Sequence, residues 1–371
     1  MKLLDYKLEE FIELIKDKRM VWFGASEMPK EICEEYPEYG FEDKIEYFID
    51  NSEAKQGQEY SLAGRNFRIV SPGYLAGHIM KDVIIVITSK YYVDIWNQLQ
   101  KMEELSDSLC VIWPMIAPQY KTDSELKEKI KLASSRESKI PKKIHYFWFG
   151  GNPIPELESR CIASWKKACP DYEIIRWDES NYDIHQNKYM EQAYKAKKWG
   201  FVPDYARLDV IYKYGGIYID TDVELVRDFD ELLGLSGFAG FESKKYVALG
   251  LGFGALPGNR IIKLLKDDYE TREFIREDGQ FNLIPSPALQ TEVLLKYGLC
   301  LNNKFQQIQD MTILPSECFS PDNNMIPHIT NNTFSIHHFS GSWTTGDNKR
   351  FLEQQRKFRN IKNKLYTLRN R

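Results

Sequence analysis

Apolar and polar residues alternate along the chain in two successive series of short runs, and the first series predicts a parallel sheet. Between Met20 and about Ile116, five apolar, β-branched or aromatic runs are separated by helix-forming or loop stretches such as YYVDIWNQLQKMEEL. The five runs are MVWFGAS, KIEYFID, NFRIVS, DVIIVITS and CVIWPMI. Strand, crossover and strand in this order are typical of a parallel sheet covered by helices. We therefore expect residues 1–120 to form a Rossmann-like parallel α/β domain.

A second and less regular series begins after Ile140. Its predicted strands are KIHYFWFGG, YEIIRWD, GIYID, FAGFES and LGFGALPG, with a helix from about Pro203 to Lys213. Residues 121–139 between the two series are polar and charged, which suits an exposed linker helix. The pattern thus predicts an α/β protein divided into a first domain (1–120), a linker (121–139), a second domain (140–345) and a basic tail (346–371).

Composition and charge narrow the class of protein. A chain of 371 residues favours two domains. The net charge of -4 gives no case for nucleic-acid binding, which favours a strongly basic surface. The six cysteines include no CxxC pair, so we expect reduced thiols and a cytoplasmic protein. Residues 1–18 predict an amphipathic helix without the apolar core of a signal peptide, and no apolar run is long enough to span a membrane.

The stretch YGGIYIDTDVE, residues 214–224, is the strongest candidate for chemistry. Gly215 and Gly216 suit the end of the preceding helix, where a positive φ is needed. The run GIYID is then expected as a strand that delivers Asp220 and Asp222 to one side, because residues i and i+2 of an extended chain share a side. Two close carboxylates repel each other unless a cation or a proton lies between them. Mn²⁺ or Mg²⁺ suits such oxygen ligands, although a strand-end turn with two solvated acids stays open for this motif alone.

The predicted helix before this stretch carries a second charged pair. Pro203 suits its first turn, and Asp204 suits the positive end of its dipole. Arg207 lies three residues after Asp204, so both side chains share one face of the helix. The helix, the double glycine and the aromatic strand make the D-x-D motif far more specific than it is alone.

Four ordered segments resemble the family 32 glycosyltransferases, which include the yeast-type mannosyltransferases and many bacterial capsule enzymes. They are IPKKIHYFWFGG, FVPDYARLDVIYKYGGIYIDTDVE, SPALQTEVL and SIHHFSGSW, and they extend over about residues 140–345. A more distant resemblance is to the large clostridial glucosylating toxins. The resemblance implies a GT-A fold, a nucleotide-sugar donor, a divalent metal and retention of the anomeric configuration.

The resemblance also implies roles for residues that bind the donor. Trp148 is similar to the aromatic residue that stacks on the donor base. Asp204 and Arg207 resemble the pair that holds the donor sugar and its diphosphate. Ser342 and Trp343 resemble the contacts to the diphosphate. Taken singly, Trp148 is better explained as a core residue and Arg207 as the partner of Asp204 or a helix cap, and only the ordered set favours the functional interpretation. SPALQTEVL matches the acceptor-side loop only loosely.

The metal ligands follow from the same resemblance. Asp222 is the expected direct ligand, with Asp220 nearer the ribose and the metal-bound water. His338 resembles the C-terminal metal ligand, but His337 is adjacent and leaves this assignment open by one residue. The implied catalytic residues are Asp204, Arg207, Asp220 and Asp222.

We therefore expect a metal-dependent, retaining glycosyltransferase of surface, for example capsular, polysaccharide synthesis. Its donor would be a nucleoside diphosphate sugar, with a UDP-sugar favoured, and its acceptor a glycan or a lipid-linked glycan. Mn²⁺ or Mg²⁺ would be its cofactor. The alternatives are a nucleotide-sugar or glycan-binding module without turnover, and a dinucleotide-dependent enzyme that uses the first domain.

The first domain offers only part of a dinucleotide-binding motif. Asp50 stands where the acid that holds a ribose would be, but GASEMP keeps only Gly24 of the expected G-x-G-x-x-G. A structural or assembly role is therefore the favoured interpretation.

The tail from residue 349 to 371 is rich in lysine and arginine, with apolar residues near helical spacing. Such a helix suits peripheral contact with the inner face of an anionic membrane, or docking on its own domain.

Overall fold

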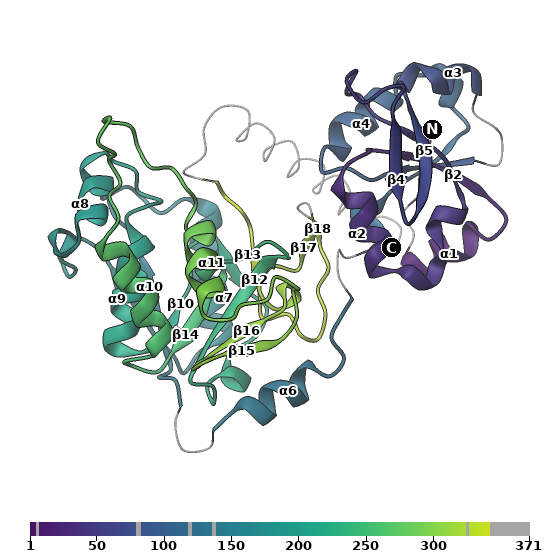
Figure 1. The fold of residues 1–371 in the computed structure, drawn as a ribbon. Coiled ribbons are helices and arrows are strands. Elements are labelled where there is room, and N and C mark those ends of the chain that lie inside the picture. Colours follow the sequence, from purple (N-terminus) through teal and green to yellow (C-terminus); the bar gives the residue numbers. More distant parts are fainter. Residues whose placement is uncertain (5–6, 79–82, 118–120, 136–138, 324–325, 342–371) are drawn as a thin grey trace. The chain divides into compact units, whose positions relative to one another are not determined.

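The computed structural model describes residues 1–4, 7–78, 83–117, 121–135, 139–323 and 326–341. The chain folds into two compact units, of which the described parts are essentially residues 1–121 with 323–328, and residues 122–322 with 329–341. Figure 1 shows both units as mixed α/β structures, so the α/β class predicted from the sequence is confirmed. The basic tail lies outside the described residues.

The first unit is built on a seven-stranded sheet in the order β1-β7-β6-β2-β3-β5-β4. All neighbouring pairs are parallel except β4–β5. Each of the five predicted runs contains one strand of this sheet. The strands are β1 (Lys2–Leu3), β2 (Arg19–Phe23), β3 (Ile45–Ile49), β4 (Glu59–Leu62), β5 (Arg65–Val70), β6 (Val83–Ile87) and β7 (Leu109–Ile112). The helices are α1 (Leu8–Leu14), α2 (Glu27–Glu35), α3 (Leu75–His78), α4 (Tyr92–Leu99) and α5 (Trp113–Ile116).

Strand β2 shows why this sheet forms. Met20 and Trp22 pack in one hydrophobic cluster, and Val21 and Phe23 pack in another. Successive side chains of a strand point to opposite faces, so a wholly apolar run is suited to a sheet that is buried on both sides. The chain passes from β2 to β3 on one side and later returns to β6 on the other, so the strand order reverses beside β2.

The start of the chain differs from the predicted amphipathic helix. Helix α1 is confined to Leu8–Leu14, and Lys2–Leu3 form an edge strand instead. The amide of Lys2 donates to the carbonyl of Ser108 (2.9 Å), and the amide of Leu4 donates to that of Cys110 (2.8 Å). Pairing with β7 therefore overrides the local helix preference of these residues.

The second unit contains an eight-stranded mixed sheet in the order β15-β16-β12-β14-β10-β8-β9, with β13 added beside β12. β8, β9 and β10 are mutually parallel, whereas β14 is antiparallel to both of its neighbours. The strands of this sheet are β8 (Lys143–Phe147), β9 (Glu173–Trp177), β10 (Gly216–Tyr218), β12 (Gly237–Ser243), β13 (Tyr246–Val247), β14 (Phe253–Ala255), β15 (Gln306–Ile308) and β16 (Met311–Leu314). A separate pair in this unit is formed by β11 (Val223–Leu225) with β19 (Ser335–His337). A further pair, β17 (Asp322–Asn323) with β18 (Ile326–Pro327), lies almost entirely in the segment that belongs to the first unit.

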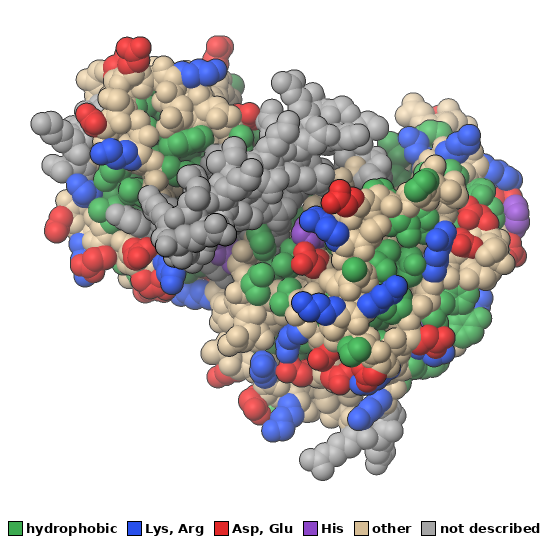
Figure 2. Space-filling model, turned by 180° about the vertical axis from the view of Figure 1, so that it is seen from behind, with side chains coloured by type: hydrophobic (Ala, Val, Ile, Leu, Met, Phe, Trp, Pro, Cys, Tyr) green, Lys and Arg blue, Asp and Glu red, His purple; other side chains and the backbone are tan. Residues whose placement is uncertain are grey.

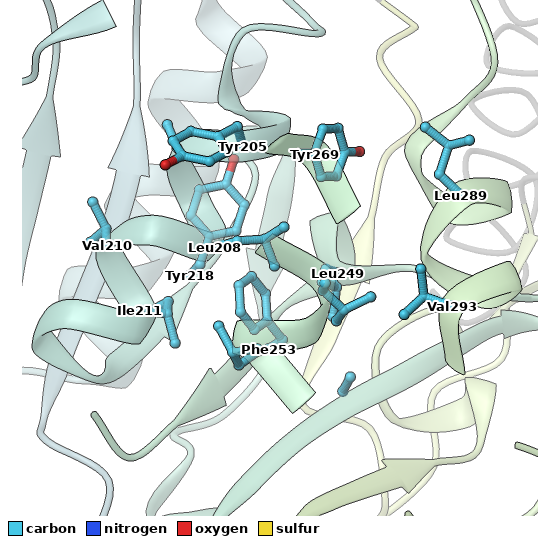
Figure 3. Close-up of a cluster of buried hydrophobic side chains, with 14 of the residues drawn as sticks. Tyr205, Leu208, Val210, Ile211, Tyr218, Leu249, Phe253, Tyr269, Leu289 and Val293 are labelled. Atoms are coloured by element: carbon cyan, nitrogen blue, oxygen red, sulfur yellow. The ribbon is translucent and has the colours of Figure 1, made fainter. Parts of the chain in front are cut away.

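Helices cover both faces of this second sheet. They are α6 (Leu126–Ala133), α7 (Glu156–Ala168), α8 (Lys188–Lys195), α9 (Pro203–Tyr214), α10 (Arg260–Glu270) and α11 (Ser286–Lys296). Figure 1 shows α8, α9 and α10 side by side. Leu208 of α9, Tyr218 of β10 and Leu289 of α11 belong to one buried cluster, and Figure 3 shows Leu208 beside Tyr218 and Leu289 toward the other end of the cluster. The interior therefore fixes the relative positions of α9, α11 and the end of β10.

The segment predicted as an exposed linker contains α6, but part of this helix is buried. Leu126 and Ile130 lie in a core cluster of the second unit and are 1% and 3% exposed. The carboxylate of Glu317 accepts from the amide of Asp123 (2.8 Å) and from the side chain of Asn332 (3.1 Å), which ties the start of this segment to the same unit. Residues 122–135 thus belong structurally to the second unit.

Acidic and basic side chains are interspersed over the face shown in Figure 2. Exposed charges of the described residues also form ion pairs, for example Lys195 with Glu191 and Lys142 with Asp171. Exposed pairs of this kind contribute little stability, with a median of about 0–1 kcal/mol.

No helix in the described part of the chain is long and apolar enough to cross a membrane.

Candidate active site

Helix α9 holds a charged pair in the interior of the second unit. It begins at Pro203 and ends before Gly215, whose φ of 63° and that of Gly216 of 100° fit the predicted double-glycine stop. Asp204 and Arg207 form an ion pair, with side chains only 3% and 4% exposed. A buried charge is costly unless it is paired, so each residue depends on the other. The structure thus brings together the two residues that the sequence predicted on one helix face.

Arg207 also connects the helix to two other parts of the unit. Its Nη2 donates to the hydroxyl of Ser286, the first residue of α11, at 2.9 Å. Its Nη1 lies 3.5 Å from Oδ1 of Asp220, and the hydroxyl of Tyr218 donates to the same oxygen at 2.5 Å. Burial and the nearby Asp222 raise the pKa of Asp220, although Arg207 acts in the opposite direction. A fixed cation therefore lies against the first aspartate of the motif.

The two aspartates converge through a turn, and not by alternation along a strand as predicted. Strand β10 ends at Tyr218. The amide of Asp220 then donates to the carbonyl of Gly250, and the amide of Val223 donates to the carbonyl of Asp220, both at 3.1 Å. One hydrogen bond to another segment and one within the turn replace the strand ladder at this point, so the chain bends around the two carboxylates.

A short helical turn, Leu249–Leu251, supports Asp220 from the other side. A Cβ atom added at Gly250 would overlap the carboxylate of Asp220, so only glycine allows this close approach. The turn is held from α11 because the side-chain oxygen of Gln290 accepts from the amide of Leu249 at 3.1 Å. Neither Gly250 nor Gln290 was predicted from the sequence. The loosely matched SPALQTEVL segment contains Gln290, and the predicted strand LGFGALPG begins just after Gly250.

The histidine that reaches the aspartates is His337, the neighbour that the sequence left open beside the expected His338. Nε2 of His337 lies 3.2 Å from Oδ1 of Asp222, whereas Nε2 of His338 lies 2.8 Å from the carboxylate of Glu224. Strand β19, which ends at His337, pairs antiparallel with β11. Successive residues at the end of a strand point to opposite sides, so neighbouring histidines diverge.

Asp222 and His337 form a charged pair. Oδ2 of Asp222 also accepts from the amide of Ser340 at 2.8 Å. Burial disfavours charge on Asp222, but His337 and this hydrogen bond hold the pKa of the carboxyl well below its usual range. Burial likewise disfavours charge on His337, but Asp222 and then Asp220 raise the pKa of the imidazole to about 9. A positive charge is therefore stabilised at this position, as two adjacent carboxylates require.

A fourth ionisable group, Glu242 on β12, faces the same charges. Burial raises the pKa of its carboxyl, and the positive charge of His337 opposes this shift. The register of β12 with β13 shifts between Phe241 and Ser243, which flank this residue. Such irregularities re-aim side chains near functional sites. The sequence contained FAGFES as a strand but gave no reason to select Glu242.

The cluster fits a divalent cation. Asp220, Asp222 and His337 each offer one ligand atom, and these atoms lie within 4.8 Å of one another. Carboxylate oxygens with one imidazole nitrogen suit Mn²⁺, and the oxygens alone suit Mg²⁺. The chemistry of the donor set thus agrees with the predicted metal, with His337 in place of His338.

The remaining predicted donor contacts are only partly described. Trp148 follows β8, which neighbours β10 in the sheet, so it lies along the same edge as the aspartates. Its ring is half-buried, and its Nε1 donates to the carbonyl of Asn152 at 2.6 Å. Ser342 and Trp343 lie outside the described residues.

The corresponding edge of the first unit is filled by its own groups. The carboxylate of Asp50 accepts from the amides of Ala25 (3.0 Å) and Ser52 (2.9 Å) and from the ammonium of Lys55 (3.1 Å). Lys55 also donates to the carbonyl of Ala25 at 2.8 Å. The acid that would hold a ribose already has three donors, which argues against the dinucleotide alternative.

Known proteins resemble the part of the chain that contains Asp204, Arg207, Asp220 and Asp222. A family model described as "Glycosyltransferase sugar-binding region containing DXD motif" matches residues 155–238. Inositol phosphoceramide mannosyltransferase 3 of Schizosaccharomyces pombe is 34% identical over 125 residues, 31% of this chain and 34% of the relative. Inositol phosphoceramide mannosyltransferase 1 of the same organism is 30% identical over 117 residues, 29% of this chain and 35% of the relative. The chain spans about a third of the length of these curated relatives.

Among solved structures, the PaToxG glycosyltransferase is similar with a TM-score of 0.36 and 20% identity, over 46% of this chain and 74% of that one. A similarity this weak carries no weight for the fold or the function.

Proposed function

We propose that the whole protein is a metal-dependent, retaining glycosyltransferase of the family 32 type, because residues 155–238 match the model of a glycosyltransferase sugar-binding region that contains a DXD motif. The second unit would have the GT-A type of fold, and the first unit a Rossmann-like fold. The donor would be a nucleoside diphosphate sugar, with uridine as the first base to test. The observation that carries the proposal is the meeting of Asp220, Asp222 and His337 within reach of the buried Arg207.

Asp220, Asp222 and His337 would hold Mn²⁺ or Mg²⁺. The ion, when bound, neutralises the negative charge that grows on the departing diphosphate. His337 would have to release its proton to act as a ligand, and the metal takes over the role of that charge between the carboxylates.

Arg207 supplies a second, fixed positive charge. Its guanidinium is oriented by Asp204, Ser286 and the ring of Tyr218, whose centroid lies 5.5 Å away. A charge that is already oriented needs no reorganisation as the leaving group forms, and removing one such donor typically costs about 10²–10³ in rate. Arg207 therefore serves the transition state more than the bound substrate.

Asp204 is better suited to orient Arg207 and the donor sugar than to attack it. Its carboxylate is buried and bonded to Arg207. A nucleophile would have to leave this pair and expose an unpaired guanidinium in the interior. Attack by the acceptor hydroxyl on the face from which the diphosphate leaves avoids this, and the departing phosphate oxygen would take the acceptor proton.

The acceptor would be a glycan or a lipid-linked glycan of surface polysaccharide synthesis, such as a capsule. The names of the two yeast relatives refer to inositol phosphoceramide, a lipid, which supports a lipid-linked substrate here. The enzyme would work in the cytoplasm, at the inner face of the membrane, and the basic tail could contribute to this contact.

A thermal-shift panel tests the binding part of the proposal. UDP, GDP, CMP and NAD are each added with Mn²⁺ or with EDTA. A ligand that binds only the native state adds about 2.7 kcal/mol of stability at 100 times its Kd. We expect a shift that requires both Mn²⁺ and UDP or GDP. A shift with NAD alone, unaffected by EDTA, would move the function to the first unit.

Turnover is tested with the nucleotide found in this panel. The corresponding NDP-sugars are incubated with enzyme and Mn²⁺, and release of sugar into water is followed by NMR. The anomer released first is expected to match that of the donor. The opposite anomer would exclude retention, and binding without release or transfer would indicate a non-catalytic sugar-binding protein.

A further inference from the structure

Three large apolar side chains lie close together on the surface just before α11. Phe281, Leu283 and Ile284 are 39%, 50% and 41% exposed, and Pro285 follows them. Single exposed apolar residues are common, but consecutive ones indicate a contact surface. We call residues 281–285 the apolar strip.

The apolar strip is anchored and does not fold into the core. The ring of Phe281 stacks on the buried Phe274, with centroids 5.4 Å apart. The amide of Asn282 donates to the carbonyl of Phe274 at 2.7 Å, and the amide of Arg276 donates to that of Gln280 at 2.9 Å. These contacts hold the strip at the surface, so exposure of Leu283 and Ile284 is a built feature of the loop.

The apolar strip runs directly into the candidate active site. The next residue, Ser286, begins α11 (Figure 1) and accepts the hydrogen bond from Arg207. Whatever covers the strip is therefore within a few residues of the proposed sugar site. The ammonium of Lys198 lies 5.5 Å from the ring of Phe281, which adds a positive charge to the apolar surface.

The size of the apolar strip favours a lipid surface over a protein partner. Three side chains of this size, each about half exposed, present roughly 200 Å². A stable protein interface needs about 800 Å² from each partner. Insertion of a few apolar side chains at a bilayer surface, beside a lysine that can reach lipid phosphates, needs no such area.

We propose that the apolar strip contacts a lipid bilayer, with Leu283 and Ile284 entering the boundary of the acyl chains and Lys198 at the phosphates. This proposal rests on the proposed function, because a lipid-linked acceptor gives the contact its purpose: the bilayer presents the acceptor beside Ser286 and Arg207. It differs from the contact expected for the basic tail, which is electrostatic.

Vesicle flotation of the full chain tests the proposal. The vesicles contain phosphatidylcholine and phosphatidylglycerol, and the salt concentration is raised to about 1 M so that electrostatic attraction is screened. The variant Leu283→Ser/Ile284→Ser is compared with the control Leu295→Ser/Leu301→Ser, whose positions are 46% and 45% exposed in the same unit. Each half-exposed aliphatic side chain is expected to contribute about a factor of five to partitioning.

We expect the strip variant to partition at least about tenfold more weakly than the wild type and the control to stay within about twofold. Equal flotation of the two variants, or loss of all flotation at high salt, would overturn the proposal and point to the tail. Thermal unfolding of both variants shows whether they are folded.

Sugar release from the donor into water, measured without lipid, separates this proposal from the proposed function. Strip-dependent flotation of a chain that releases no sugar would keep the lipid contact and remove the glycosyltransferase. Sugar release by a chain that does not float would keep the glycosyltransferase and remove the lipid contact.

Discussion

In both units, acidic residues follow a parallel strand at the carboxyl edge of the sheet, but their carboxylates have different partners at the two edges. In the first unit, Asp50 follows β3, and its carboxylate accepts hydrogen bonds from two backbone amides and from the ammonium of Lys55. In the second unit, Asp220 and Asp222 follow β10 and face one another, with His337 charged beside them. At the first edge, hydrogen-bond donors of the unit itself already bind the carboxylate of Asp50. At the second edge, two carboxylates and an imidazole lie together, and their ligand atoms can bind a cation. The carboxyl edge of a parallel sheet is therefore a place where sites can form, and its own loops decide whether one does.

The largest expected effect is on turnover, when the carboxylate of Asp222 is removed from the second unit. Asp222→Ala should lower kcat/KM by about 10²-fold or more, because stabilisation of the leaving group is lost. Glu224→Ala is the matched control, since Glu224 is exposed two residues later and bonds His338. Steady-state kinetics with saturating Mn²⁺ measure both variants. Similar rates for Asp222→Ala and the wild type would refute the metal assignment.

A buried histidine beneath the second edge gives a large effect on stability. Trp177 donates to Nδ1 of His145 at 3.1 Å, and Nε2 of His145 lies 3.0 Å from the carbonyl of Gly215. A neutral ring protonated at Nε2 satisfies both neighbours. Burial lowers the pKa of His145 from 6.5 to about 4, although the bond to Gly215 opposes this shift.

Between about pH 4 and pH 6.5, the folded state therefore binds fewer protons at His145 than the unfolded state does. Stability is complete above about pH 6.5 and falls by about 3 kcal/mol as the pH drops toward 4. Denaturant unfolding at a series of pH values measures this slope, and His145→Gln should flatten it. An unchanged slope in that variant would assign the acid sensitivity to other groups.

The neighbouring residues His337 and His338 are expected to differ in their effect on the Mn²⁺ dependence of activity. His337→Ala should raise the Mn²⁺ concentration needed for half-maximal activity by at least about tenfold, as loss of a ligand does. His338→Ala should change it by less than about threefold, because His338 contacts Glu224 and not the aspartates. Titration of activity with Mn²⁺ distinguishes them. A larger effect at His338 would restore the ligand expected from the sequence.

The smallest effect is expected at the first edge, where the acid has a structural role. Asp50→Ala should lower the free energy of unfolding by about 1–3 kcal/mol, because two amides and Lys55 lose their acceptor. Sugar transfer by the folded variant should stay unchanged. The neighbouring exposed Glu53→Ala is the control for unfolding experiments. Loss of activity at Asp50 without loss of stability would give the first unit a part in the reaction.

Much of the fold could be predicted because it depends on local patterns. Apolar runs such as VIIVI predicted buried parallel strands, here β6 (Val83–Ile87), and Pro203 with Gly215 marks the ends of α9. Local spacing also predicted the pair of Asp204 and Arg207. These features need no knowledge of which segments meet.

The sequence was wrong, or left a choice open, where distant segments decide the outcome. The choice between His337 and His338 depends on how β19 pairs with β11, and the turn at Asp220 depends on a hydrogen bond to Gly250. Gly250 and Gln290 could not be selected, since their roles exist only when α11 lies beside the motif. The buried side of α6 left a weak signal, because Leu126 and Ile130 are spaced by one helical turn.

The pairing of β11 with β19 has a consequence for the order in which the protein becomes competent during synthesis. Asp222 leaves the ribosome more than a hundred residues before His337, which completes the same cluster. Until then the two aspartates have no imidazole to balance them, even if the sheet around β10 has already folded. A nascent chain should therefore complete the surroundings of Arg207 and Asp220 once α11 has been made, and the candidate cation site only after β19. Termination after β16 but before β19 would keep the strands of the main sheet and remove His337 from the candidate cation site.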